Sequence, residues 1–254
     1  SWINWCDVND NNDKVVLSTS AYEIRPDMKY RDTMYLIDKK TGQLINSIEV
    51  PPVAPFENTV MRGSPNFSED GEFLAAACSD GRGMLFDAAG KVLWQRELSK
   101  PAQIDNVWIN ASGRDGFTAE AGVIFTTINT FNRENWQLPT PVEHPSNNSM
   151  FVFNYDGTFK YKYRALGTME QIDFSNNMAA CAVGRNVRTH NYAAHGAVVL
   201  DLNDGTELNF FHTEGPLQAV AISSNGKKIA GIEAPAVTPE GKIIGAYRLH
   251  IWQR

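Results

Sequence analysis

The chain has 254 residues, of which 43% are hydrophobic and 20% are charged, and its net charge at pH 7 is −6. This composition is typical of a globular protein, and the absence of any run of about 18 apolar residues argues against a transmembrane segment. Lysine and arginine do not cluster, which argues against nucleic-acid binding because phosphate contacts need concentrated positive charge.

Pairs of short strands joined by turns recur along the chain. Apolar and polar residues alternate within each predicted strand, and Asp, Asn or Gly separates the two strands of a pair. Gly42, Gly90, Gly157 and Gly205 close one class of turn, as expected where a hairpin requires a positive φ. The predicted pairs span residues 3–20, 34–50, 65–80, 84–98, 107–128, 150–165, 172–184, 197–213 and 220–234.

A second class of turn alternates with the first. Asp70-Gly71 and Asn225-Gly226 are turns of this class, whereas the third unit is expected to have a longer connection through Gly113 and Gly116. Two strand pairs therefore form a unit of four strands, which recurs about every 45–65 residues.

Periodic four-stranded units with little helical patterning predict an all-β fold, a β-propeller of antiparallel blades. Five blades are visible in a single domain, and the last stops after its third strand, so the chain is either a five-bladed unit or part of a larger propeller. A twisted β-sandwich is the alternative, but it gives no reason for one hairpin pair to recur in fixed order. The predicted blades span residues 1–57, 58–101, 102–167, 168–215 and 216–254.

The segment LFDAAGKVLWQREL, with Asp87, Gly90 and Trp94, resembles the repeat of PQQ-like (quinoprotein-like) propellers. The segment FSEDGEFLAAACSDG is similar to WD40-like repeats. Membership of these families implies a propeller that is often extracytoplasmic, periplasmic or secreted, in a bacterium or archaeon. The chain departs from the quinoprotein pattern, because Trp94 alone fits the repeated tryptophan and no adjacent cysteine pair exists. Bound PQQ is therefore not expected, and no cofactor is predicted.

The long connections are predicted to lie on one face of the propeller. They span residues 21–31, 129–148, 185–195 and 235–245, and insertions gathered on one face of a repeat protein usually mark its binding face. Arginine and aromatic residues, which are enriched at interaction hot spots, are frequent in them. The candidate binding residues are Arg25, Tyr30, Arg31, Arg133, Trp136, Arg185, Arg188, His190, Tyr192 and His195. The alternative is that these residues are solvated loop side chains and aromatic plugs over the sheet edges.

No catalytic constellation is recognisable. The sequence lacks a Gly-x-Ser-x-Gly elbow, and His144, His190 and His195 are a weak metal signal without a fixed carboxylate pair. Cys6, Cys78 and Cys181 are interpreted as buried free thiols. We therefore expect a non-catalytic binding or scaffold propeller that docks a protein partner, or further domains of a longer chain, on its long-loop face. The alternative is an enzyme or small-molecule sensor, related to PQQ-like oxidoreductases, with a pocket where the central channel opens on that face.

Overall fold

The computed structural model describes residues 2–20, 32–51, 53–56, 64–104, 107–131, 143–184, 194–238 and 240–254. In these residues the structure is all β, with five large antiparallel sheets, which we call blades 1 to 5, and a small inserted hairpin. No helix long and apolar enough to cross a membrane occurs in this described part.

Each blade is a run of consecutive strands. Blade 1 contains β1 (Trp2–Asn9), β2 (Lys14–Ser20), β3 (Asp32–Asp38) and β4 (Leu44–Val50). Blade 2 contains β5 (Asn66–Phe67), β6 (Phe73–Ala77), β7 (Arg82–Asp87) and β8 (Val92–Glu97). Blade 3 contains β9 (Ala102–Ile104), β10 (Val107–Ala119), β11 (Gly122–Phe131), β12 (Ser149–Phe153) and β13 (Phe159–Arg164).

Blades 4 and 5 complete the row. Blade 4 contains β14 (Met169–Ser175), β15 (Met178–Val183), β16 (Gly196–Asp201) and β17 (Glu207–His212). Blade 5 contains β18 (Leu217–Ile222), β19 (Lys228–Glu233) and β22 (Arg248–Gln253). The inserted hairpin, β20 (Ala236–Val237) and β21 (Ile243–Ile244), lies between β19 and β22. The predicted four-stranded antiparallel units are confirmed in blades 1, 2 and 4, and the last unit of three strands is confirmed in blade 5, whereas blade 3 has a fifth strand, β9.

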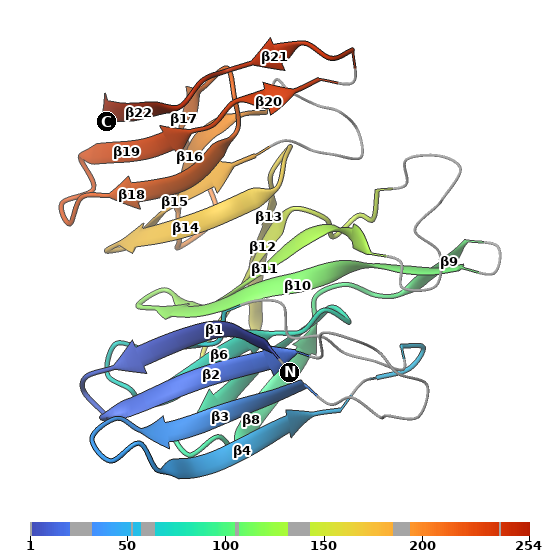
Figure 1. Cartoon of the computed structure of the whole chain (residues 1–254), viewed down its shortest axis with the longest axis vertical. Helices are drawn as coiled ribbons and strands as arrows, with labels where there is room; N and C mark the ends of the chain where they lie inside the picture. Colours follow the sequence, from blue (N-terminus) through green and yellow to red (C-terminus); the bar gives the residue numbers. More distant parts are fainter. Residues whose placement is uncertain are drawn as a thin grey trace.

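The hydrophobic core lies between neighbouring blades, which succeed one another from the blue strands of blade 1 to the red strands of blade 5 (Figure 1). Leu36 of blade 1 and Phe86 of blade 2 belong to the first of these inter-blade clusters. Val199 of blade 4 and Leu217 of blade 5 belong to the last. Each internal blade therefore buries apolar side chains on both faces, as the period-two alternation of a strand allows.

The repeat residues Asp87, Gly90 and Trp94 have structural roles. Asp87 Oδ1 accepts the backbone N–H groups of Ala89 and Lys91, both at 2.9 Å, and Gly90 closes the turn at a φ of 87°. Trp94 Nε1 donates to the carbonyl of Tyr155 at 2.8 Å, which ties blade 2 to blade 3.

The predicted connection through Gly113 and Gly116 is wrong. Both glycines lie inside β10, and the turn follows Ala119. A Cβ at Gly113 would lie 2.3 Å from the carbonyl oxygen of Cys78, and one at Gly116 would lie 2.6 Å from the nitrogen of Ala76. These glycines allow β10 to pack directly on the backbone of blade 2.

Candidate functional site

The antiparallel blades give the molecule two ends. The connections β1–β2, β5–β6, β10–β11 and β18–β19 are short turns at one end, which we call the turn face (left in Figure 1). The strand ends that flank the long connections, such as the end of β2 and the start of β3, lie at the other end, which we call the loop face (right in Figure 1).

Nine of the ten predicted binding residues lie outside the described residues: Arg25, Tyr30, Arg31, Arg133, Trp136, Arg185, Arg188, His190 and Tyr192. His195 is described, and its side chain has no exposed surface. Its Nδ1–H donates to the carbonyl of Glu214 at 3.0 Å, joining the start of β16 to the connection between blades 4 and 5. The structure therefore places His195 in the interior and not on the exposed surface that the sequence predicted. The burial expected for Cys78 and Cys181 is confirmed, whereas that expected for Cys6 is wrong, because Cys6 lies exposed in β1.

His144 also has a structural position below the loop face. Its Nε2–H donates to the carbonyl of Lys100 at 2.8 Å, and its Nδ1 accepts the backbone N–H of Ser146 at 3.0 Å. Burial lowers the pKa of this imidazole below its usual value. The ring thus holds the connection to blade 3 against the segment that leads into β12. Among the described residues, no group of three or more His, Cys, Asp or Glu side chains is placed to hold a metal ion.

The insertion of blade 5, residues 234–238 and 240–247 of the described chain, exposes several apolar side chains on the loop face. Val237 in β20 is 56% exposed, Ile243 in β21 is 67% exposed and Tyr247 is 81% exposed. β20 and β21 pair with each other and not with the strands of the blade, and Ala236 of β20 is buried whereas Val237 is exposed.

Glu233 anchors the base of this insertion. Its carboxylate is fully buried and accepts the backbone N–H of Gly215 at 2.7 Å, the backbone N–H of Ala246 at 3.4 Å and Nε2–H of His250 at 2.6 Å. Burial by itself would raise the pKa of Glu233, but these hydrogen bonds and the nearby Arg248 outweigh it and hold the pKa below its ordinary value. The buried carboxylate is thereby kept ionised and paired.

Aromatic stacking continues this anchor into the blade. The ring of His250 stacks on Trp252 at 5.1 Å with an interplanar angle of 2°, and Trp252 stacks on Phe211 of blade 4 at 5.2 Å. Phe211 and Trp252 pack against the cluster between blades 4 and 5. The insertion is therefore held by a chain of contacts that reaches the core.

A cavity of about 210 Å³ opens on the loop face beside blade 2. Its wall contains the buried ion pair of Arg82 and Asp80, with Nη2 and Oδ2 2.7 Å apart. Arg82 also donates to the carbonyl of Pro51 at 2.8 Å and to Gln95 Oε1 at 3.2 Å. This guanidinium ties the connection from blade 1 to blade 2, which is a structural role.

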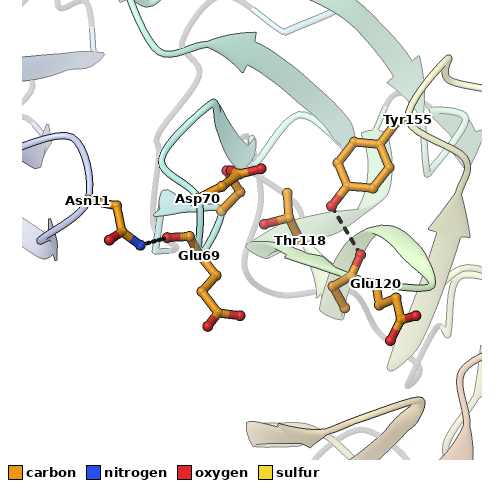
Figure 2. Close-up of a pocket in the computed structure, with 8 residues that line it drawn as sticks. Asn11, Glu69, Asp70, Thr118, Glu120 and Tyr155 are labelled. Carbon is orange, nitrogen blue, oxygen red and sulfur yellow. Dashed lines mark hydrogen bonds between the residues drawn. The ribbon is translucent and has the colours of Figure 1, made fainter.

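A larger cavity, of about 450 Å³, lies on the turn face (Figure 2). Turns of three blades line it, and the acidic residues Glu69, Asp70 and Glu120 are among the lining residues. Asp70 accepts hydrogen bonds from Ser68 and from the backbone N–H of Glu72, which lower its pKa. An opening lined by carboxylates favours a cationic group over an anion.

The hydrogen bonds around this cavity serve the turns themselves. Asn11 Nδ2 donates to the carbonyl of Glu69 at 2.6 Å, and the hydroxyl of Tyr155 donates to the carbonyl of Ala119 at 3.0 Å (Figure 2). Burial raises the pKa of this tyrosine, so it stays protonated as a donor. The sequence predicted Asp70 only as part of a turn, although the adjacent acidic residues Glu69 and Asp70 and a third at Glu120 were a visible signal.

No family model matches the sequence, and no curated protein matches it. Solved structures do match. One is Raptor of Chaetomium thermophilum, with a TM-score of 0.58 and 9% identity over 98% of this chain. Another is hydrazine synthase of Kuenenia stuttgartiensis, with a TM-score of 0.60 and 11% identity over 99% of this chain. A third is the β-propeller domain of Cps50 (Swd1) from Myceliophteria thermophila, with a TM-score of 0.50 and 12% identity over 99% of this chain.

The chain has the β-propeller fold. It spans 19% of the Raptor chain, 62% of the hydrazine synthase chain and 83% of the Swd1 domain. At these sequence identities the comparison establishes the fold and does not establish an activity, because one fold can carry many functions. The specific resemblance to PQQ-like propeller repeats stays a prediction.

Proposed function

We propose that this propeller is a non-catalytic binding module whose loop face docks a protein partner or a further domain. The observation that carries the proposal is the exposure of Val237, Ile243 and Tyr247 together on the blade-5 insertion. Grouped apolar side chains with polar residues around them are typical of protein interaction sites, and tyrosine is enriched at binding hot spots.

The way the insertion is held supports a binding role. Because Glu233 accepts hydrogen bonds from both Gly215 and Ala246, it fastens the base of the insertion to blade 5. A surface that is ordered before binding loses less conformational entropy when its partner arrives. Arg248 and Glu214, whose side chains are 49% and 57% exposed, give this patch a polar rim.

The chemistry of the partner follows from the patch. A protein surface with an apolar depression for Tyr247, and with polar groups facing Arg248 and Glu214, would complement it. The candidate arginines and aromatic residues of the other long loops would extend this surface. The proposal includes an extracytoplasmic location, which is implied by the resemblance to PQQ-like repeats.

Replacing Ile243 and Tyr247 together by serine is expected to remove the principal partner without unfolding the propeller, because both side chains are exposed. The double variant and the wild-type protein would serve as baits for affinity capture from the source cells, with recovery quantified by mass spectrometry. We expect at least one protein to be recovered about tenfold less with the variant, which corresponds to about 1.4 kcal/mol of binding free energy.

The matched control replaces Val92 and Phe159, 44% and 54% exposed near the turn face, by serine. This control is expected to capture the same proteins as the wild type. Equal recovery of every protein by the loop-face variant and the wild type would contradict docking through the insertion.

A further inference from the structure

The cavity on the loop face beside blade 2 has a wall that is apolar on one part and polar on another. Val53, Ala54, Phe56 and Pro101 supply the apolar part. Phe56 is buried and Val53 is 44% exposed, so this part of the wall reaches from the interior to the surface. The volume of about 210 Å³ equals that of about seven water molecules in the liquid. The cavity therefore has room for one amino-acid side chain or a small molecule of similar size.

The charged residues of this wall balance one another. Arg82 and Arg96 are cationic, and Asp80 and Glu97 are anionic. Arg82 and Asp80 form a buried ion pair, with side chains 10% and 1% exposed. A charged ligand would add an unbalanced charge to this site, and taking such a charge out of water is costly. The charge balance favours a neutral ligand.

Two hydrogen-bond donors of the wall have capacity left for a ligand. The Nε and Nη2 hydrogens of Arg82 are used on Asp80 and on the carbonyl of Pro51. Nη1 carries two hydrogens and donates one of them to Gln95 Oε1 at 3.2 Å. Because a guanidinium only donates, Oε1 of Gln95 faces Arg82, and the two Nε2 hydrogens of its amide have no acceptor among the described residues.

An acceptor lies beside these donors. Glu97 on β8 is the register partner of Arg82 on β7. Strand alternation places Gln95 and Glu97 on the same face of β8. Within the part of the chain that the structure describes, the carboxylate of Glu97 makes no hydrogen bond or ion pair. The wall thus offers donors at Arg82 and Gln95 and an acceptor at Glu97.

We propose that this cavity binds a neutral carboxamide group carried on a short apolar stem. The carbonyl oxygen of the amide accepts from Arg82 and Gln95, its N–H donates to Glu97, and the stem packs on Val53 and Phe56. A few placed polar groups in an apolar hollow are typical of small binding pockets. The carboxamide comes either from an asparagine or glutamine side chain of a docked protein, in which case the inference rests on the proposed function, or from a free small molecule.

Three probes of similar size test the chemistry: butyramide, butyrate and butylammonium. Each is titrated into the purified 254-residue protein, and NMR follows the side-chain N–H signals of Gln95 and Arg82. We expect butyramide to shift these signals saturably at millimolar concentration, and the two charged probes to bind at least about tenfold more weakly. The absence of a saturable shift with butyramide, or tighter binding of either charged probe, overturns the proposal.

Gln95→Glu is the variant that removes the ligand's donor. Its carboxylate still accepts from Arg82, but the amide hydrogens are replaced by a negative charge, and the exposed position tolerates the change. Butyramide should bind this variant at least about tenfold more weakly than the wild type. Gln43→Glu makes the same change at an exposed glutamine of blade 1 and should bind butyramide like the wild type. Equal affinities of Gln95→Glu and the wild type overturn the assignment.

Affinity capture with Gln95→Glu as bait distinguishes the two sources of the carboxamide. Loss of the protein that the insertion captures assigns the amide to a side chain of that protein. Unchanged capture, together with butyramide binding to the wild type, assigns it to a free small molecule. The titration itself needs no partner. Failure of docking through Ile243 and Tyr247 would therefore leave the titration result unchanged, so the two proposals fail separately.

Discussion

Replacing Phe125 by alanine is expected to lower the free energy of unfolding by about 3–5 kcal/mol, the largest effect of any single change considered for this propeller. Phe125 is fully buried between blades 2 and 3 and meets Trp94 edge to face at 5.9 Å and Phe153 at 6.0 Å. Its ring also lies directly over Gly83, where a Cβ would come within 2.6 Å of it. Truncation would leave a cavity in the middle of the row of blades.

Urea denaturation followed by circular dichroism measures this loss. Phe159→Ala is the matched control, because Phe159 contacts Phe153 at 5.5 Å but is 54% exposed, and its cost should stay below about 1 kcal/mol. Equal midpoints for the two variants would contradict the account of a core made by packing between blades.

Replacing Glu233 by alanine is expected to cost about 2–3 kcal/mol of stability and to release the blade-5 insertion. The change removes the acceptor for two backbone N–H groups and for His250. Hydrogen exchange at residues 243–247 should be faster in the variant than in the wild type. Exchange in β15, which lies in blade 4, should be the same in both proteins. Unchanged protection of the insertion would contradict the anchoring role of Glu233.

The conservative variant Glu233→Gln separates charge from hydrogen bonding. The amide oxygen still accepts from Gly215 and Ala246, so this variant should lose about 1 kcal/mol. Because the pKa of Glu233 is lowered in the folded protein, its contribution is complete above the ordinary glutamate pKa and is lost as pH falls through the lowered value. The stability of Glu233→Gln should therefore depend less on pH in the acidic range than that of the wild type.

Much of the blade architecture was visible in the sequence because hairpin turns have a local chemistry. Gly42 and Gly90 adopt φ values of 69° and 87°, as their turns require. The turn predicted at Gly113 and Gly116 was wrong because these glycines are needed for a contact with a distant part of the chain. They make room for the backbone of blade 2. Glycine is needed at such a close contact as well as in a turn, so the sequence alone does not distinguish the two roles.

The candidate site was less predictable. Glu233 ends the segment IAGIE, and its alternation places it on the side of Ile229 and Gly231, the buried face of blade 5. That signal was available, but its partner His250 follows a long insertion, and the pairing depends on the register of β19 with β22. His195 was predicted as a surface residue because loop position alone does not reveal burial.

The most direct test of docking through the blade-5 insertion is site-specific photo-cross-linking in the source cells. A benzophenone side chain would be placed at position 247 and, for comparison, at position 92 near the turn face, where both native side chains are exposed. Docking through the insertion predicts a discrete adduct of one mass from position 247 and none of that mass from position 92. The same adducts from both positions, or no adduct from position 247, would contradict it.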